Sequence, residues 1–260
     1  MTRLRPMFGW YGSKWRLAPT YQSPRYDTII EPFAGGAGYS LLYADRDVRL
    51  VDIDPVVVGI WEYLIRTPEA EILRLPLCAP DRSVPGLDAL PQEARWLIGM
   101  WLGFSLSSPR VTMSKTIARH DRDSSRWSAE TRERIARQVG RIRHWSIAQG
   151  SYEQIARDID VTWFVDAPYE IQGKHYVHGS GRIDYCELGR RCQSLQGQVI
   201  ACENHEATWL PFRYHRRMAG TTTLSGHRRT SVEVVWTSQP DDQGRLALVD
   251  TAAESGRETA

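Results

Sequence analysis

The segment Trp163-Phe164-Val165-Asp166-Ala167-Pro168-Tyr169 places a carboxylate, a proline and an aromatic ring at the end of an apolar run. This order of residue types suits the binding of an exocyclic amine of a nucleic-acid base, which is a poor nucleophile because its lone pair is delocalised into the ring. The Asp166 carboxylate can accept one N–H of the amine, and the main-chain carbonyl of Ala167 can accept the other. Tyr169 offers a face on which the base can stack. The alternative interpretation is a plain strand-ending turn built around Pro168.

A glycine-rich turn, Phe33-Ala34-Gly35-Gly36-Ala37-Gly38, follows an apolar segment at residues 26–30. Glycines let the backbone approach a ligand closely, and Asp52 lies where an acid binds ribose hydroxyls in dinucleotide-type folds. The alternative is a tight strand-to-helix connection without a ligand. The preceding Glu31-Pro32-Phe33 distinguishes the turn from the G-x-G-x-x-G pattern of nicotinamide binders.

A third segment could contribute to a binding site. It is Phe8-Gly9-Trp10-Tyr11-Gly12-Ser13-Lys14-Trp15, which combines aromatic residues, a turn and a lysine. We expect Lys14 to pair with a carboxylate of a bound cofactor and Trp10 to pack beside it. The alternative is an aromatic anchor that closes the core.

Apolar and β-branched segments predict the strands that position these residues. The expected strands cover residues 26–30, 48–52, 161–166, 198–202 and 232–236, and a helix is expected to begin within residues 39–42. The first two strands and the intervening turn form a β-turn-α-β unit. This pattern predicts an α/β fold with a Rossmann-like sheet and helices on its faces.

Between residues 68 and 150, proline-rich loop signals give way to helical periodicity at residues 93–106 and 130–145. We therefore expect a main domain of residues 1–66 and 150–238, interrupted by a helical subdomain at residues 67–149. The polar stretch 239–260 is expected to be a mobile tail.

Composition excludes several classes of protein. A hydrophobic content of 42% argues against a collagen-like or disordered chain. No apolar run is long enough for a membrane span, and the first residues lack the apolar core of a signal peptide, so we expect a cytoplasmic protein without membrane association. The spacing of Cys78, Cys186, Cys192 and Cys202 predicts no metal site.

Basic residues gather in the expected insert although the formal net charge is only +2. Helical spacing places Arg134, Arg137 and Arg141 on one face, which we expect to contact phosphates, while the loop at residues 107–110, with Arg110, reaches towards bases. Lys115 of the insert is also expected to contact nucleic acid. The alternative is a solvated helix face. A second basic rim is expected from Arg213, His215, Arg216, Arg217, His227, Arg228 and Arg229.

Together these segments resemble the Dam-like class of DNA adenine methyltransferases of phages and bacteria. Trp10 to Lys14 is similar to the W-x-G-G-K element of that class, with Ser13 in place of a glycine, and Glu31 to Ser40 is similar to E-P-F-x-G-x-G-S. Asp52-Ile53-Asp54 resembles the D-I-N element, and Asp166-Ala167-Pro168-Tyr169 resembles the catalytic D-P-P-Y. Residues 199–206 and 226–234 resemble the following core strand and the closing loop and strand. The resemblance covers residues 1–66 and 150–238.

The resemblance implies an S-adenosylmethionine-dependent methyltransferase that acts on the N6 amine of adenine in DNA, with the insert as the target-recognition subdomain. It implies that DNA is the partner and S-adenosylmethionine the cofactor. The oligomeric state cannot be read from the sequence, and a monomer is favoured. The implied catalytic residues are Asp166, Ala167, Pro168 and Tyr169. The implied cofactor contacts are Trp10, Lys14, Phe33, Gly35, Gly36, Asp52, Tyr152 and Asp166.

Two departures from the class pattern bear on activity. Ala167 stands where proline is usual, but the acceptor there is a main-chain carbonyl that alanine also supplies. Gly150-Ser151-Tyr152 replaces a Gly-Asp-aromatic element, so Tyr152 can still pack on the cofactor adenine while a carboxylate is missing. The class's Asn- and Gly-rich target-reading hairpin is not recognisable in the insert.

Three alternatives remain open at this stage. The same acceptors serve methylation of the N4 amine of cytosine, which the sequence does not separate from adenine. Ala167 and Ser151 are also compatible with a catalytically weakened nucleic-acid-binding homologue. The unrecognised target-reading element leaves methylation of RNA or of a small molecule as a third alternative.

Overall fold

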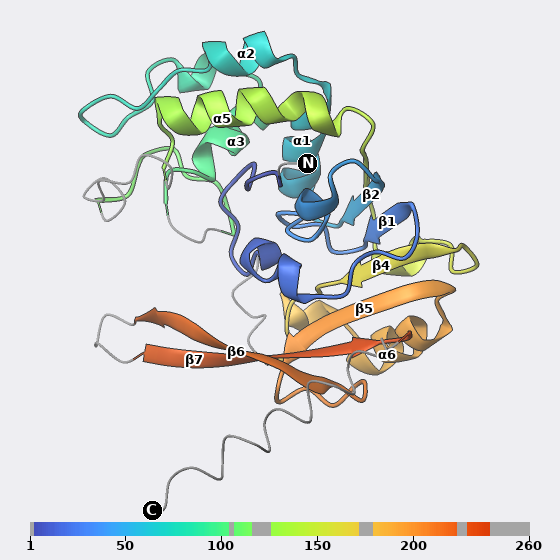
Figure 1. Cartoon of the computed structure of the whole chain (residues 1–260). Coiled ribbons are helices and arrows are strands. Elements are labelled where there is room, and N and C mark those ends of the chain that lie inside the picture. The colour runs from blue at the N-terminus through green and yellow to red at the C-terminus, as the bar shows by residue number, and fades with distance from the viewer. Residues whose placement is uncertain (1–2, 104–106, 116–125, 172–178, 223–227, 240–260) are drawn as a thin grey trace, which may run out of the picture.

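The computed structural model describes residues 3–103, 107–115, 126–171, 179–222 and 228–239. Its centre is a seven-stranded sheet in the order β3-β2-β1-β4-β5-β7-β6 (Figure 1). The strands are β1 (Thr28–Glu31), β2 (Asp47–Asp52), β3 (Ser146–Gln149), β4 (Val161–Val165), β5 (Gly197–Asn204), β6 (Arg213–Thr222) and β7 (Arg228–Thr237). Strands β1 to β5 are parallel, β7 is antiparallel to β5, and β6 is antiparallel to β7. The prediction of an α/β fold is confirmed.

Helices cover both faces of this sheet. They are α1 (Pro55–Arg66), α2 (Glu69–Arg74), α3 (Gln92–Gly99), α5 (Ala129–Val139) and α6 (Tyr185–Ser194). Successive side chains of strand β4 point to opposite faces of the sheet and pack in different hydrophobic clusters. Trp163 packs in a cluster with Leu188 of α6, and Phe164 packs in the cluster that contains Trp61 of α1. All five residues of β4 are buried, as expected of a central parallel strand.

The five expected strands are all present, with ends shifted by a few residues, but β3 and β6 were not predicted. Strand β3 has only one half-buried residue and three exposed ones, so it carries little apolar signal. Strand β6 begins with the basic run Arg213 to Arg217, which reads as a charged surface segment rather than a strand. Pairing with β2 and β7, respectively, specifies these strands.

The expected helices are shorter in the structure. Helix α3 ends at Gly99, which packs closely against the returning loop: a Cβ atom there would lie 2.6 Å from the Arg110 carbonyl oxygen, and the Arg110 amide donates to the Gly99 carbonyl at 3.2 Å. Helix α5 is capped at its start by the Ser128 side chain, which accepts from the Thr131 amide, and ends at Val139 before a single 3-10 turn, Gly140–Ile142. The helix expected at residues 39–42 is the 3-10 turn Ser40–Tyr43.

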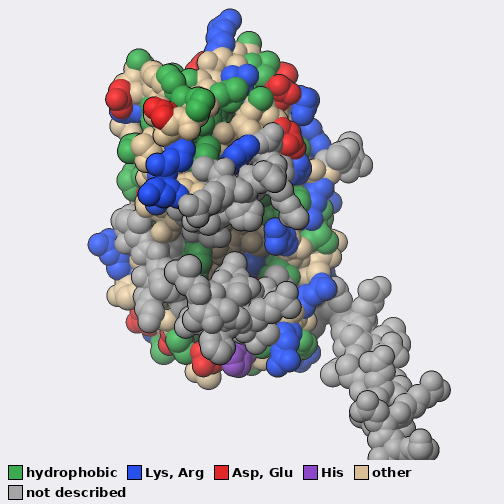
Figure 2. Space-filling view, turned by 90° about the vertical axis from the view of Figure 1, so that its left-hand side faces the viewer, with side chains coloured by type: hydrophobic (Ala, Val, Ile, Leu, Met, Phe, Trp, Pro, Cys, Tyr) green, Lys and Arg blue, Asp and Glu red, His purple; other side chains and the backbone are tan. Residues whose placement is uncertain are grey.

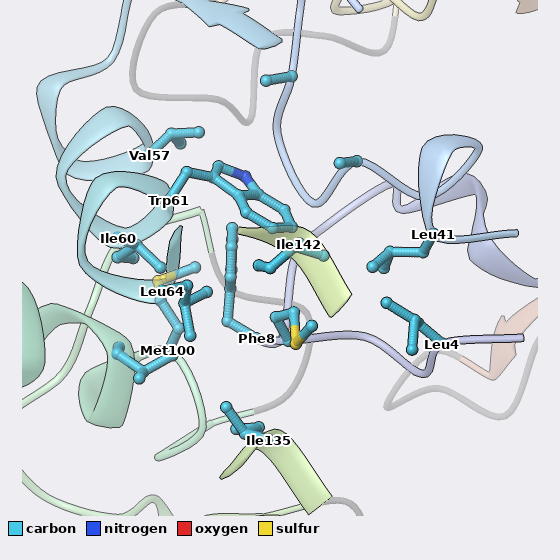
Figure 3. Close-up of a cluster of buried hydrophobic side chains, with 14 of the residues drawn as sticks. Leu4, Phe8, Leu41, Val57, Ile60, Trp61, Leu64, Met100, Ile135 and Ile142 are labelled. Carbon is cyan, nitrogen blue, oxygen red and sulfur yellow. The ribbon is translucent and has the colours of Figure 1, made fainter. Parts of the chain in front are cut away.

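The helices of the expected insert share the core of the sheet domain. Trp61 and Leu64 of α1, Met100 after α3 and Ile135 of α5 are buried in one cluster with Phe8 of the N-terminal segment (Figure 3). Figure 1 shows α2, α3 and α5 gathered over α1 on one side of the molecule. Strand β3, which lies inside the expected insert, belongs to the main sheet. The helical layer is thus an extension of the same hydrophobic core.

Two further observations concern the expectations on membranes and the tail. No helix among the residues that the structure describes has the length and apolar character needed to cross a membrane. The expected mobile tail lies outside the described residues, except for Gln239, whose side chain donates to the Gly197 carbonyl.

Candidate active site

A cavity of about 370 Å³ opens at the carboxyl ends of the parallel strands. Its wall contains residues 35–38 after β1, Asp52 at the end of β2, residues 150–153 after β3, and Asp166 after β4. Strand order reverses between β1 and β4, and ligands of open α/β sheets bind in the crevice at such a switch point. The structure therefore joins the two segments that the sequence marked as chemically significant in one cavity.

Close contact with Trp10 explains the glycines of the turn. Gly35 has a φ of +41°, and a Cβ atom there would lie 2.5 Å from Nε1 of Trp10. A Cβ atom on Gly38 would lie 2.5 Å from the Trp15 amide nitrogen. Trp10, Gly35 and Gly36 all line the cavity. The N-terminal segment thus closes over the turn and forms part of the same wall.

Asp52 is held in place by main-chain donors. Its Oδ2 atom accepts from the Gly35 amide at 2.9 Å, and its Oδ1 atom accepts from the Asp54 amide at 2.9 Å. Each carboxylate oxygen has a second lone pair, so the fixed carboxylate retains the capacity to accept ligand hydroxyls. The geometry matches the position expected for a ribose-binding acid at the end of β2.

The Asp166 carboxylate forms an ion pair with Lys14. The Lys14 Nζ atom lies 2.6 Å from Asp166 Oδ1 and 3.9 Å from Glu233 Oε1, and the Lys14 side chain is only 8% exposed. Burial raises the pKa of Asp166 to about 6, with Glu233 acting in the same direction and Lys14 opposing it. Lys14 lines the cavity, and its ammonium group donates to the Asp166 carboxylate of this chain, whereas the sequence predicted a cofactor carboxylate as its partner.

Tyr169 is anchored by a carboxylate that lies on a distant strand. Its hydroxyl donates to both oxygens of Glu233 on β7, at 2.8 Å each, and the Tyr21 hydroxyl donates to Glu233 Oε1 at 2.7 Å. The Lys14 Nζ atom lies 4.6 Å from the centre of the Tyr169 ring. One face of this ring is therefore covered by Lys14, and Glu233 fixes the orientation of the ring.

The remaining members of the Asp-Ala-Pro-Tyr turn are also held firmly. Ala167 is 3% exposed, and the Pro168 carbonyl accepts a hydrogen bond from the Tyr185 hydroxyl at the start of α6. Of the four residues of this turn, Asp166 and Pro168 line the cavity, and Ala167 and Tyr169 are not among its described lining residues.

Two aromatic rings form the opposite wall. The centres of the Phe33 and Tyr152 rings lie 5.1 Å apart, and both residues line the cavity. The buried Tyr152 hydroxyl has no hydrogen-bond partner within the described part of the chain. Glu153 follows directly, lines the cavity and contacts the Ser151 hydroxyl at 3.1 Å. A carboxylate thus lies two positions after Ser151, although the sequence indicated that one was missing.

Acidic side chains dominate the charge of the cavity wall. The acidic lining residues are Glu31, Asp52, Asp54, Glu153 and Asp166, and the basic ones are Lys14 and Arg182. Glu31 is 2% exposed, and burial raises its pKa to about 8 although the Ser40 amide donates to it at 2.8 Å. With Glu31 largely protonated at neutral pH, the other four acidic side chains still favour a cationic ligand.

One of the predicted phosphate contacts is wrong. Arg134 is 7% exposed, its guanidinium group donates to the Pro6 carbonyl at 2.7 Å, and it lies 5.4 Å from the Trp101 ring centre. Burial lowers its pKa to about 10. The periodicity of α5 placed Arg134 on a face with Arg137, but that face is partly covered by the N-terminal segment.

The other predicted nucleic-acid contacts differ in their surroundings. Arg110, in the loop after α3, and Lys115, at the start of a helical segment, are exposed. Arg137 is exposed and lies 4.0 Å from Glu133, whereas Arg141 follows the end of α5 and pairs with Asp45 at 2.8 Å. Arg228 and Arg229 begin β7, and their side chains lie outside the described part of the structure.

Sequence reasoning missed several residues of the site. Glu233 had a detectable signal, since it is a lone acid inside the β-branched strand Ser231 to Val235. Arg182 and Ile183 line the cavity from the 3-10 turn before α6 and carried no local pattern. Only the fold brings them to the site.

Comparison with known proteins adds no relative. No protein-family model matches the chain, and no curated protein matches it at a significant level. The functional argument therefore depends on the geometry and charge of the cavity.

Proposed function

We propose that this protein is an S-adenosylmethionine-dependent DNA methyltransferase that modifies the exocyclic N6 amine of adenine. The observation that carries the proposal is the single cavity that joins the glycine-rich turn, Asp52 and the turn that begins at Asp166. A cofactor site and an amine-binding carboxylate at the same switch point are what group transfer to a base requires, because the reacting atoms must be held within about 3–3.5 Å.

The residues of the cavity fit S-adenosylmethionine better than a phosphate-bearing cofactor. The sulfonium and the amino group of this molecule are positively charged. The wall carries four carboxylates besides Glu31, whose raised pKa of about 8 leaves it largely protonated at neutral pH, against two basic side chains. The same charge repels the phosphates of a nicotinamide dinucleotide or a nucleoside triphosphate. The volume of about 370 Å³ lies within the range of roughly 300–1,000 Å³ of small-molecule sites.

Specific residues would hold the parts of the cofactor. Asp52 would accept the ribose hydroxyls, and Phe33 and Tyr152 would flank the adenine ring. The unpartnered Tyr152 hydroxyl and the nearby Glu153 carboxylate would provide polar partners for the polar edge of that ring. When bound, S-adenosylmethionine supplies an electrophilic methyl group on a sulfonium.

The chain's own residues would prepare the amine. The Asp166 carboxylate and the Ala167 carbonyl would accept its two N–H groups and so favour a pyramidal nitrogen with an available lone pair. These acceptors strengthen as positive charge develops on the nitrogen, which is the differential binding that lowers a barrier. Lys14 would keep a counterion during this step, because Glu233 lies 3.9 Å from its Nζ atom. Asp166 would then hold the proton that the amine loses.

The test is transfer of an isotopically labelled methyl group to unmodified DNA, followed by digestion to nucleosides and identification of the labelled base by mass spectrometry. The expected product is N6-methyladenine. Label on N4-methylcytosine would select the cytosine alternative, and label only on RNA or on a small molecule would refute DNA as the substrate. Absence of transfer to any of these by a protein that binds the cofactor would favour the weakened homologue.

Two variants make the test specific to the proposed site. Asp166→Asn should reduce transfer by about 10³-fold because the amide has one acceptor oxygen instead of a charged pair. Asp158→Asn removes the same charge from an exposed loop and serves as the matched control. Equal activity of the Asp166→Asn and Asp158→Asn proteins would contradict the assignment.

A further inference from the structure

The arginines of β6 differ from those of the helical layer in their partners. Around α5, three arginines donate hydrogen bonds to main-chain carbonyls of other segments: Arg132 to Leu75, Arg134 to Pro6, and Arg143 to Ile65 and Thr67. Two more, Arg137 and Arg141, lie within salt-bridge distance of Glu133 and Asp45. Most guanidinium groups of this region therefore have intramolecular partners.

On β6, Arg213, Arg216 and Arg217 are exposed, and none forms an ion pair or a hydrogen bond with a side chain in the described residues. We call these three residues the β6 arginine strip. Tyr214, between the first two, is 69% exposed. Three positive charges within five residues thus lack a neutralising side chain within the part of the chain that the structure describes.

The strip lies on the edge strand of the sheet, next to β7, whose Glu233 contacts Tyr169 and Lys14; β5 and β7 separate it from β4. Arg216 pairs in register with Glu233 of β7, and Glu233 binds the Tyr169 hydroxyl. The neighbouring His215 stacks on Tyr21 at 4.8 Å between ring centres and contacts the Thr20 hydroxyl at 2.8 Å. Strand β6 is thereby fixed against the N-terminal segment that also carries Lys14. Figure 2 shows Lys and Arg side chains on several sides of the centre of one face of the molecule.

We infer that the β6 arginine strip binds the phosphate backbone of the DNA substrate. This inference rests on the proposed function and adds the surface by which the substrate is held. A strand of five residues spans roughly 13 Å, and duplex DNA presents one negative charge about every 1.7 Å of its axis. The planar guanidinium group binds phosphate through two parallel hydrogen bonds. A backbone that follows β6 passes beside β7, whose Glu233 anchors the Tyr169 ring on which the base is proposed to stack.

Charged residues on an edge strand have another known role, which is to prevent pairing with a second sheet. The two roles predict different properties for variants in which these arginines are replaced by neutral residues. A protective role predicts that neutral variants self-associate while their affinity for DNA is unchanged. Phosphate binding predicts that affinity and its salt dependence fall together.

The experiment compares the full-length protein with the variant Arg213→Gln/Arg216→Gln/Arg217→Gln. Binding of a fluorescent DNA duplex is measured by anisotropy at several salt concentrations, without cofactor, and light scattering reports self-association. Three lost phosphate contacts should lower the slope of log affinity against log salt by about 2.7 and the affinity by roughly 100-fold or more at 0.1 M salt. A variant with lysine at all three positions should retain most of the slope.

The matched control is Arg66→Gln/Arg74→Gln/Arg190→Gln, which removes the same charge from exposed arginines on α1, α2 and α6. It should leave the slope within about 0.5 of the unmodified protein, because distant exposed charges are screened. Equal slopes for the β6 variant and the unmodified protein, an equal loss in the control, or tighter binding of an RNA duplex than of DNA would overturn the inference. Because binding is measured without methyl transfer, a protein that binds DNA through β6 but transfers no methyl group would refute the proposed function alone.

Discussion

Helix α5 and strand β6 are both rich in arginine, but the structure uses these arginines in different ways. Around α5 the guanidinium groups bind carbonyls and carboxylates of neighbouring segments, as Arg134 does with Pro6. On β6 the three arginines face solvent at the edge of the sheet. Arginine carries five donors on a long apolar stem, so it can brace a helical layer as well as bind a phosphate. The role of an arginine-rich segment therefore depends on whether its guanidinium groups have partners within the protein.

The largest effect should come from Arg134→Ala, which tests the structural half of the comparison. The substitution removes a charged hydrogen bond to Pro6 and the packing on Trp101, so unfolding should become easier by about 3 kcal/mol. Chemical denaturation measures this change. Arg217→Ala on β6 is the matched control and should change stability by less than about 0.5 kcal/mol. Similar losses for both would remove the distinction between the two regions.

A smaller effect is expected from Glu233→Gln, which tests the link between the β6–β7 pair and the proposed chemistry. The amide keeps a hydrogen bond to Tyr169 or Tyr21 but loses the charge beside Lys14, so kcat should fall by about 30-fold. The KM for DNA should change little, because the β6 arginine strip is intact. Steady-state kinetics separate the two constants, and a raised KM with normal kcat would disconnect Glu233 from the chemistry.

The same variant should also shift the pH dependence. The negative charge of Glu233 helps to raise the pKa of Asp166, so its removal should move the acid limb of kcat to lower pH. Lys14, Tyr21, Tyr169, Glu31, Cys202 and Glu203 are the other titratable groups that interact with Asp166. If Glu233 had only a structural role, the substitution would lower kcat without shifting the acid limb of its pH profile.

In the unmodified protein, the rate of methyl transfer and the affinity for DNA should depend differently on pH. The Asp166 carboxyl group, with a pKa of about 6, becomes protonated below that pH and loses its capacity as a charged acceptor, so transfer should fall about tenfold per pH unit well below 6. Arginine does not titrate in this range, so DNA affinity through β6 should stay nearly constant between pH 5 and 8. Parallel pH profiles of binding and transfer would contradict this separation.

The smallest effect is expected from Arg137→Gln/Arg141→Gln, which tests α5 as a DNA-binding face. Both residues have acidic neighbours, Glu133 and Asp45, and their exposed pairs contribute less than about 1 kcal/mol. DNA affinity should fall less than about threefold and the salt slope by less than about 0.5. An effect as large as that of the β6 variant would show that α5 also binds the phosphate backbone.

The sequence motifs that line the cavity could be found from local patterns, because each motif directly follows an apolar strand. The turn at Gly35, the acid Asp52 and the turn at Asp166 each follow an apolar strand, and parallel strands bring their carboxyl ends to one edge of the sheet. Buried β4 and β5 were predictable for the same reason. Strand β3 was not, because its exposed residues carry no alternation and only pairing with β2 specifies it.

The environment of a charged side chain was less predictable. Arg134 has the helical spacing of a solvent-facing residue, but the N-terminal segment covers it. Lys14 was expected to face a cofactor carboxylate, but its nearest carboxylate is Asp166, and Glu233 is its second neighbour from the opposite end of the chain. Such pairings depend on packing between segments far apart in the sequence, which the spacing of neighbouring residues does not predict.

The order of residue types along the chain by itself determined the α/β class, the central strands and the turns that supply a carboxylate and glycines to a common edge. Those features follow from hydrophobic periodicity and backbone preference, which act over a few neighbouring residues. Only the tertiary structure decided which arginines brace the helices and which remain exposed on β6, and that Glu233 stands behind Tyr169 and Lys14. The physical reason is that burial and charge pairing depend on distances through space between segments far apart in the chain.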